Sequence, residues 1–553
     1  MVTKIMLQEA AGEAQKVLLS FLPAEDLQHH HFSERFEEKM KKLVRRVNHP
    51  VRYLVLRIAA AILIVITTLF GAMLTFSPDV HAAVRDWISE TFTQAPGTTE
   101  PTAPKEENIT WTFDGNTLTI SGSGDMEDYR TTTDSMLPSE DPPWYDWRKS
   151  IKNVIIEPGI TSIGNYAFLE CTELCSITIP DTVTRIGNGA FSFAGMSKIT
   201  IPESVTEIGF SAFSHCRSLG EIVIPSGVTE IQSSTFALCP WLQSITLPQG
   251  LVSIGKSAFY NCERLKQIDI PDTVTQIDAN AFDHCIALEN ITIPEGVTEI
   301  KDHTFSHCNS LRKVTLPEGI VSIGQWAFAN CNSLTGFSIP KRVASIGDCA
   351  FMGCNLFTSV NLPATLESLG QSAFASCEML TTVTISGNLT ELLPGTFSGC
   401  HKLKSINLPE RLTVIGDQAF KGCRNLTNIT IPDSVSSIGK EAFRSCQSLT
   451  SVTIPADIQD LGAKAFVSCT SLKVVYFRGL PAVIPFETFV DTPIWHVLIA
   501  GSEEDWNSIV FEEGWNGRYY ETGNTALLDA IQHFNCTGDE HVDLANKTCS
   551  LCG

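Results

Sequence analysis

The sequence predicts a β-rich solenoid of about 15 turns, preceded by a single transmembrane helix. Phenylalanine recurs every 23 residues from Phe168 to Phe489, apart from one spacing of 22. In thirteen of these turns a cysteine follows the repeated phenylalanine by three positions. An uncharged run of 19 residues, Ile58–Phe76, precedes the repeats. Fifteen phenylalanines in one register exclude chance and indicate a single repeated structural unit.

Residues 1–50 are predicted to form a cytosolic helical segment. Apolar residues recur at helical spacing between Phe32 and Val47, and Ser33 stands where a helix could begin. Residues 1–57 carry ten Lys/Arg and seven Asp/Glu, a net charge of +3. An alternative is a helix lying against anionic lipid, which that charge would favour.

A transmembrane helix is predicted over residues 53–76. Its uncharged run would form a helix of about 28 Å, close to the hydrocarbon thickness of a bilayer. Seven Lys/Arg lie between Lys39 and Arg57, so the N-terminus is expected in the cytoplasm and the repeats outside the cell. A cleaved signal peptide ending near Ala82 is the alternative, although more than fifty residues precede the apolar run.

Residues 77–108 are predicted to be a juxtamembrane segment and linker. Thr93–Asn108 is rich in Pro and Thr, which favours an extended, solvated chain. Beyond residue 57 the chain holds 29 basic and 54 acidic residues, a net charge of −25. Such a polyanion repels phosphate groups, so we expect no nucleic-acid partner.

One repeat, residues 251–271, shows how a turn is built. It reads LVSIGKSAFYNCERLKQIDIP, with apolar residues at regular positions that stacked turns would bury together. The segment L-x-x-I-x-I predicts a short strand that ends at proline, and V-x-x-I predicts a second short strand. The segment A-F-x-x-C between them is predicted to form a helical turn.

These residues resemble leucine-rich repeats of the BspA type over about Ile151–Phe489. The resemblance implies a curved leucine-rich-repeat solenoid of 23-residue repeats, with short strands and helical turns, of the kind found in bacterial surface proteins that bind or adhere. We therefore assign residues 109–150 to a β-rich N-terminal cap, 151–490 to the repeats, 491–535 to a C-terminal cap and 536–553 to a cysteine-containing tail. Caps are needed because the terminal turns would otherwise expose their cores.

The thirteen repeated cysteines are interpreted as a reduced packing ladder. A free cysteine behaves as a small buried apolar residue, and the parallel side chains of stacked turns do not suit disulfide torsions. In the tail, Cys536, His541, Cys549 and Cys552 provide four residue types that ligate zinc, so a zinc site is one prediction there. A disulfide with one free thiol, or simply a frayed tail, is the alternative.

The sequence shows no catalytic constellation, and we expect no enzyme. Gly250–Ser257 matches a phosphate-binding loop letter for letter, but sister repeats hold the same register without Lys-Ser. His284 and His307 share one position in adjacent turns and should be neighbours. We interpret them as polar surface side chains rather than metal ligands.

The candidate ligand-binding surface is the outward face of the L-x-x-I-x-I strands. Residues on either side of the middle apolar residue point away from the core, and most are short hydroxyl or amide side chains. The proposed contact residues are Thr246, Asn290, Thr292, Thr315, Asn361, Thr384, Asn407 and Thr430. Such a face, about 70 Å long at about 4.7–5 Å per turn, suits an extended protein or glycan, and equally a merely soluble surface.

The segment His31–Phe92 resembles the N-terminal part of clostridial single-span membrane proteins related to anti-sigma factors. The resemblance implies that residues 1–50 could hold a sigma factor, although the zinc-binding His/Cys motif of many such domains is missing. Two functions follow: a membrane-anchored surface protein whose repeats bind a macromolecule without catalysis, or a transmembrane signalling protein whose repeats are the sensor.

Overall fold

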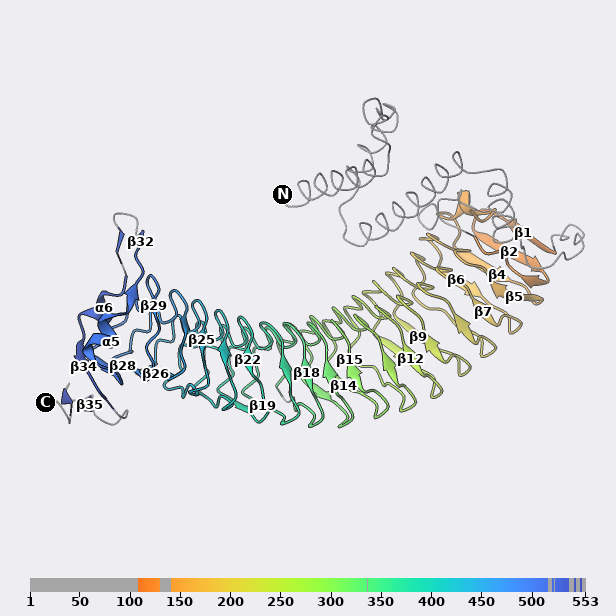
Figure 1. The fold of residues 1–553 in the computed structure, drawn as a ribbon. Coiled ribbons are helices and arrows are strands. Elements are labelled where there is room, and N and C mark those ends of the chain that lie inside the picture. The colour runs from red at the N-terminus through yellow and green to blue at the C-terminus, as the bar shows by residue number, and fades with distance from the viewer. Residues whose placement is uncertain are drawn as a thin grey trace, which may run out of the picture. The chain divides into compact units, whose positions relative to one another are not determined.

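The structure, a computed structural model, describes residues 108–129, 141–335, 337–515, 520–521, 523–536, 542–543 and 548–549. These residues belong to one compact unit, in which the chain winds into stacked coils along a curved path (Figure 1). The predicted cytosolic segment 1–50, the transmembrane helix 53–76 and nearly all of the linker lie outside the described residues. Within the described part, no helix is long and apolar enough to cross a membrane.

The L-x-x-I-x-I segments form one side of the solenoid, called here the long-strand ladder. Alternate side chains point inward and are buried, as in β14, where Ile291 is 3% exposed and its two neighbours are exposed. Where neighbouring coils both form strands, these pair in parallel, and they make up several separate sheets. The strands are β2 (Thr117–Gly122), β4 (Asn153–Ile156), β6 (Ser176–Thr178), β9 (Glu221–Val223), β11 (Ser244–Thr246), β14 (Asn290–Thr292), β16 (Lys313–Thr315), β19 (Ser359–Leu362), β21 (Thr382–Ile385), β23 (Ser405–Ile406), β26 (Ser451–Ile454), β28 (Val474–Phe477), β30 (His496–Ile499) and β34 (Ile531–His533).

The V-x-x-I segments form a second parallel ladder, called here the short-strand ladder, whose strands are mostly two residues long. Except in β3, the last residue of each strand is apolar and in most coils buried, as Ile254 is. The strands are β3 (Gly124–Asp125), β5 (Ile160–Ile163), β7 (Arg185–Ile186), β8 (Glu207–Ile208), β10 (Glu230–Ile231), β12 (Ser253–Ile254), β13 (Gln276–Ile277), β15 (Glu299–Ile300), β17 (Ser322–Ile323), β18 (Ser345–Ile346), β20 (Ser368–Leu369), β22 (Glu391–Leu392), β24 (Val414–Ile415), β25 (Ser437–Ile438), β27 (Asp460–Leu461), β29 (Val483–Ile484) and β31 (Val510–Phe511).

The segment A-F-x-x-C does not form the helical turn that the sequence predicted. Two residues per coil, four positions apart, have left-handed backbone angles, for example Tyr166 at φ 57° and Glu170 at φ 58°. Because a helix needs right-handed angles throughout, these residues break it. Alternate N–H groups instead bond to the next coil: Tyr166 donates to Asn188 O at 2.8 Å and Phe168 to Ala190 O at 2.8 Å. The segment is therefore a ladder of turns that ties neighbouring coils together.

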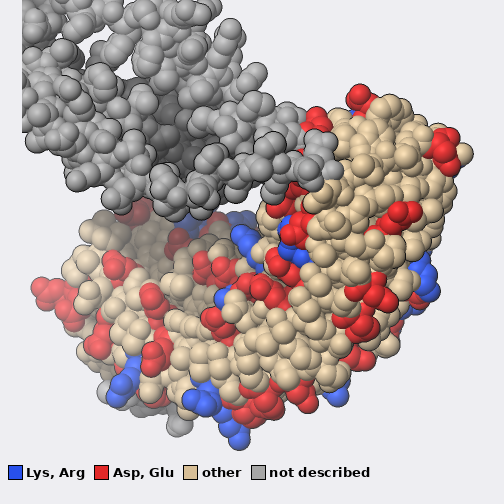
Figure 2. Space-filling view, turned by 90° about the vertical axis from the view of Figure 1, so that its right-hand side faces the viewer, with Lys and Arg blue, Asp and Glu red and all other residues tan. Residues whose placement is uncertain are grey.

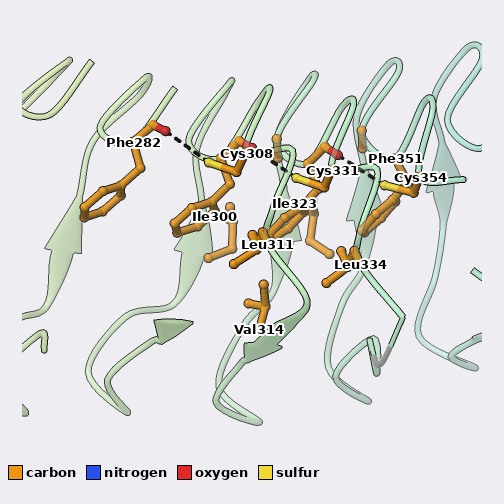
Figure 3. Close-up of a cluster of buried hydrophobic side chains, with 14 of the residues drawn as sticks. Phe282, Ile300, Cys308, Leu311, Val314, Ile323, Cys331, Leu334, Phe351 and Cys354 are labelled. Carbon is orange, nitrogen blue, oxygen red and sulfur yellow. Dashed lines mark hydrogen bonds between the residues drawn. The ribbon is translucent and has the colours of Figure 1, made fainter. Parts of the chain in front are cut away.

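The repeated phenylalanines form one continuous stack through the core. Neighbouring rings lie nearly parallel with centroids 5.1–5.8 Å apart, and every ring from Phe168 to Phe489 is fully buried. Leucine and isoleucine of both ladders pack around them, as Figure 3 shows for Leu311, Leu334 and Ile323. Each coil alone would expose this face, so stacking is what buries the core.

The cysteine ladder is buried, and its thiols are free. From Cys216 to Cys469 each Sγ lies 3.1–3.3 Å from the carbonyl oxygen of the phenylalanine one coil earlier, as Cys308 does from Phe282 (Figure 3). The same carbonyl accepts the backbone N–H of the cysteine in its own coil. The packing prediction is confirmed, and the S–H group adds a weak hydrogen bond between coils.

The N-terminal cap is itself a modified coil. Strand β1 (Ile109–Phe113) pairs antiparallel with β2, which continues the long-strand ladder. Trp144 takes the position of the repeated phenylalanine: it stacks on Phe168 with centroids 5.9 Å apart, and its Nε1 donates to Ala167 O at 2.7 Å. A short 3-10 helix, η1 (Tyr145–Trp147), follows. The cap therefore closes the core and extends both ladders.

The C-terminal cap continues both ladders and adds two short helices. These are α5 (Glu503–Asn507), which begins with a capping box between Ser502 and Asp505, and α6 (Thr525–Leu528). Asn524 Oδ1 accepts the backbone N–H of Phe489 at 3.0 Å, which ties the cap to the last coil of the stack. Two hairpins complete this region: β32 (Gly514–Trp515) pairs with β33 (Tyr520–Glu521) between the two helices, and β35 (Val542–Asp543) pairs with β36 (Thr548–Cys549) after them.

Candidate functional site

The structure places all eight predicted contact residues on the exposed side of the long-strand segments. Their inward neighbours are buried, so the alternation that the sequence predicted is correct here. Parallel pairing sets Asn290 beside Lys313, Thr292 beside Thr315 and Asn361 beside Thr384. Short polar side chains thus form rows that run from coil to coil. We call this surface the polar strand face.

Asn407 is used within the solenoid rather than offered to a ligand. Its Nδ2 donates to Ile385 O at 2.9 Å, and its Oδ1 accepts the Ile385 N–H at 3.0 Å. The side chain therefore replaces the backbone bonds that the next pair of the ladder would make. The candidate contact role of Asn407 is weakened for this reason.

The polar strand face is not one continuous sheet. In the part of the chain that the structure describes, three of the long-strand segments are not assigned as strands: Lys198–Thr200, where Lys198 forms only an isolated bridge to Glu221, Gln267–Asp269 and Asn428–Thr430. Thr430 therefore lies in one of the interruptions. Thr246 lies on β11, the last strand before the interruption at Gln267–Asp269. The prediction of a strand in every coil is wrong at these three positions.

A shallow groove of about 590 Å³ lies over the interruption at Gln267–Asp269. Buried Ile268 and Ile291 form its floor, and polar side chains of three coils form its walls. Asn290 and Thr292, both predicted from the sequence, are among its lining residues. The full lining is Gln243, Ser244, Lys266, Gln267, Ile268, Asp269, Ile270, Glu289, Asn290, Ile291 and Thr292.

The groove exposes backbone as well as side chains. Among the described residues, the N–H groups of Gln267, Asp269 and Ile270 form no hydrogen bond to a neighbouring coil. Such groups need water or a ligand as partner. Asp269 is the signal that could have located the groove, because it is the one acidic residue at its strand position and aspartate is disfavoured in strands.

Charge on the repeats is predominantly acidic, as the sequence indicated. Figure 2 shows one end of the unit, where Asp and Glu are spread over the visible surface and Lys and Arg stand in smaller groups between them. Exposed pairs such as Lys198–Glu221, at 2.6 Å, neutralise part of this charge locally. The groove is lined by charges of both signs, Lys266, Asp269 and Glu289.

The predicted zinc ligands of the tail are only partly described. Cys536 is buried beside Tyr476, whose hydroxyl donates to Cys536 O at 3.0 Å, and its Sγ lies 3.4 Å from His533 O. The backbone of Cys549 lies in β36, whereas His541 and Cys552 lie outside the described residues. The zinc site stays a prediction. His533, which precedes Cys536 by three positions, was missed as a candidate although the spacing H-x2-C is visible in the sequence.

Comparison with known proteins identifies the repeat. The family model described as "BspA type Leucine rich repeat region (6 copies)" matches residues 144–262, 229–357, 327–423 and 394–514. No curated protein matches the chain.

Solved structures of bacterial leucine-rich-repeat proteins are similar to this chain. One from Bacteroides ovatus is 27% identical with a TM-score of 0.50, covering 67% of this chain and 93% of its own. One from Eubacterium ventriosum is 25% identical with a TM-score of 0.40, covering 66% and 93%. A leucine-rich cell surface protein from Faecalibacterium prausnitzii is 24% identical with a TM-score of 0.35, covering 76% and 100%. Because the family model matches more than half of the sequence, the chain belongs to the BspA-type leucine-rich-repeat family.

Proposed function

We propose that the repeats bind an extended extracellular protein or glycan without catalysis, and that residues 53–76 anchor the protein in the cell membrane. The chain is a leucine-rich-repeat solenoid, and this family is generally non-enzymatic. The observation that supports the proposal is the polar strand face, where exposed hydroxyl and amide groups repeat from coil to coil on paired strands. Strand pairing fixes these groups in position, so a ligand need not order them on binding.

The groove supplies the second type of contact. The free backbone groups of Gln267–Ile270 can hydrogen-bond to a peptide or to sugar hydroxyls, while Ile268 offers a small apolar floor. A ligand lying along the face would make repeated weak contacts and a stronger one here. Such multivalent binding gains affinity without a deep pocket.

The test is a screen of the full-length chain on arrays of extracellular proteins and glycans. Each ligand found is then tested with Asn290→Arg/Thr292→Arg, which fills the groove and the adjoining face. The matched control is Val252→Arg, an exposed residue beside the short-strand ladder. Loss of binding in the first variant and retention in the control support the proposal. Equal binding by both variants contradicts it.

A second function, transmembrane signalling, is favoured by the resemblance of His31–Phe92 to anti-sigma-related membrane proteins. Residues 1–50 would then hold a sigma factor inside the cell while the repeats sense a ligand outside. A pull-down with the full-length chain from lysate of the source cell tests this. Recovery of one sigma factor, lost in Phe32→Ala/Phe36→Ala/Met40→Ala, supports signalling. Equal recovery by both proteins, or none, contradicts it.

A further inference from the structure

Two histidines and a buried carboxylate meet on the turn ladder. His284 and His307 precede the repeated cysteine in adjacent coils, where left-handed backbone angles of 62° and 58° aim both side chains the same way. Their rings stack with centroids 4.2 Å apart. Asp283 Oδ1 lies 2.8 Å from His284 Nδ1 and 3.7 Å from His307 Nδ1. We call these three residues the Asp-His-His cluster.

Asp283 is an unusual residue for its position in the turn ladder, directly after the repeated phenylalanine. The equivalent position of every other coil holds an uncharged residue or, in two coils, Lys421 and Arg444. The Asp283 side chain is only 8% exposed, and among the described residues it forms no ion pair with Lys or Arg. A buried carboxylate is costly unless charged or polar partners compensate it. Here the partners are the two imidazoles and Asn280 Nδ2 at 3.3 Å.

We propose that Asp283, His284 and His307 form a binding site for Zn²⁺ or a similar borderline-soft divalent cation. Two imidazole nitrogens and one carboxylate oxygen are a donor set that suits zinc, and all three ligand atoms lie within 4.8 Å of one another. In a tetrahedral site with bonds of about 2.0–2.1 Å, ligand atoms lie about 3.4 Å apart. The observed separations bracket this value, so side-chain rotations suffice to close the site.

Neighbouring polar side chains can orient the ring of His307 for a cation. Ser306 Oγ lies 2.8 Å from His307 Nδ1, and Asn330 Nδ2 lies 3.1 Å from its Nε2. With a metal on Nδ1, the Nε2 proton would bond to Asn330 Oδ1 after the amide turns over, which would fix the ring. Both histidines are 38% exposed, so the fourth position faces solvent.

The core holds the two backbone segments of the cluster together. Phe282, next to Asp283, accepts the thiol of Cys308, which follows His307 (Figure 3). The N–H of His284 donates to Ser306 O at 2.8 Å, so the two coils are also bonded directly. The backbone of the cluster is thus fixed before any ion arrives.

The test is zinc binding by the full-length chain after removal of metal by chelator. Cys536→Ser/Cys549→Ser/Cys552→Ser serves as the starting protein, so that the tail does not contribute. Calorimetric titration with ZnSO₄ should show one ion per chain. His284→Ala/His307→Ala, and separately the near-isosteric Asp283→Asn, should weaken the affinity at least tenfold. His215→Ala, at the equivalent position of another coil, should leave it unchanged, and circular dichroism checks that each variant is folded. Unchanged affinity in the folded cluster variants, or no zinc binding by the starting protein, would overturn the proposal.

Discussion

Raising the pH above 9 should destabilise the solenoid through its cysteine ladder. Burial raises the pKa of Cys239, Cys400 and Cys469 from 9.0 to about 12, and it raises the pKa of the other ladder thiols in the same direction. Below pH 9 the thiols are protonated in both the folded and the unfolded state, and the full stability is present. Between pH 9 and 12 the unfolded chain releases protons that the folded chain keeps, so stability falls as the pH rises.

The magnitude follows from the number of buried thiols. One pH unit above the unfolded pKa, each thiol shifts the free energy of unfolding by about 1.4 kcal/mol. Thirteen buried thiols together lower it by roughly 18 kcal/mol at pH 10. Typical domains are stable by about 5–15 kcal/mol, so we expect the repeats to be strongly destabilised as the pH approaches 10.

The assay is urea unfolding of the full-length chain between pH 8 and 10, followed by circular dichroism with a reductant present. In a variant with Cys331→Ala, Cys354→Ala and Cys377→Ala, three thiols no longer titrate. Its free energy of unfolding should therefore fall near pH 10 by about 4 kcal/mol less per pH unit than that of the parent protein. A free energy of unfolding that stays constant between pH 8 and 10 would refute the reasoning. An equally steep fall of the free energy of unfolding with pH in the variant and in the parent protein would also refute it.

Three further predictions concern packing and access. Phe305→Ala should lower the free energy of unfolding by about 3–5 kcal/mol in urea titrations, because it removes a fully buried stacked ring. The control Val321→Ala, at an exposed residue, should change it by less than about 1 kcal/mol. Equal losses would contradict the claim that the stacked rings stabilise the core. Trp144→Phe should cost less than Trp144→Ala in the same assay, since phenylalanine keeps one stacked aromatic ring although it loses the rest of the indole and its bond to Ala167 O; equal costs would mean that ring packing contributes nothing. A maleimide with peptide mapping should label exposed Cys175 in native protein and the ladder thiols only in urea, and rapid native labelling of any ladder thiol would contradict their burial.

The repeat period and the core positions could be predicted because the same apolar residues recur in register. Phe305 and Cys308 are buried for a reason visible in every turn of the sequence. The turn ladder could not be predicted as easily. Left-handed angles at residues such as Tyr166 and Glu170 are unfavourable on their own and are sustained by bonds to the next coil. Asn and Gly at the same position in other coils, such as Asn261 and Gly353, were the available signal.

The sequence predicts which side chains of the candidate surface point outward, but not all of the contacts that they make. Strand alternation alone placed Thr292 and Thr384 outward. By contrast, the internal bonds of Asn407 and the interruption at Gln267–Asp269 depend on the contacts between coils, which no single repeat encodes. The Asp-His-His cluster could be predicted in part. The 23-residue spacing makes His284 and His307 neighbours, but only the structure shows that Asp283 joins them.

The affinity of an arginine series for the array ligand tests the central claim, multivalent binding along the polar strand face, most directly. Arginine replaces Thr292 alone, then Thr292 and Thr315, then also Asn361 and Thr384. Because each coil contributes a separate weak contact, each added substitution should lower the affinity by a further factor, and these factors should multiply. Unchanged affinity throughout the series, or complete loss at the first substitution with no further effect, would contradict the account.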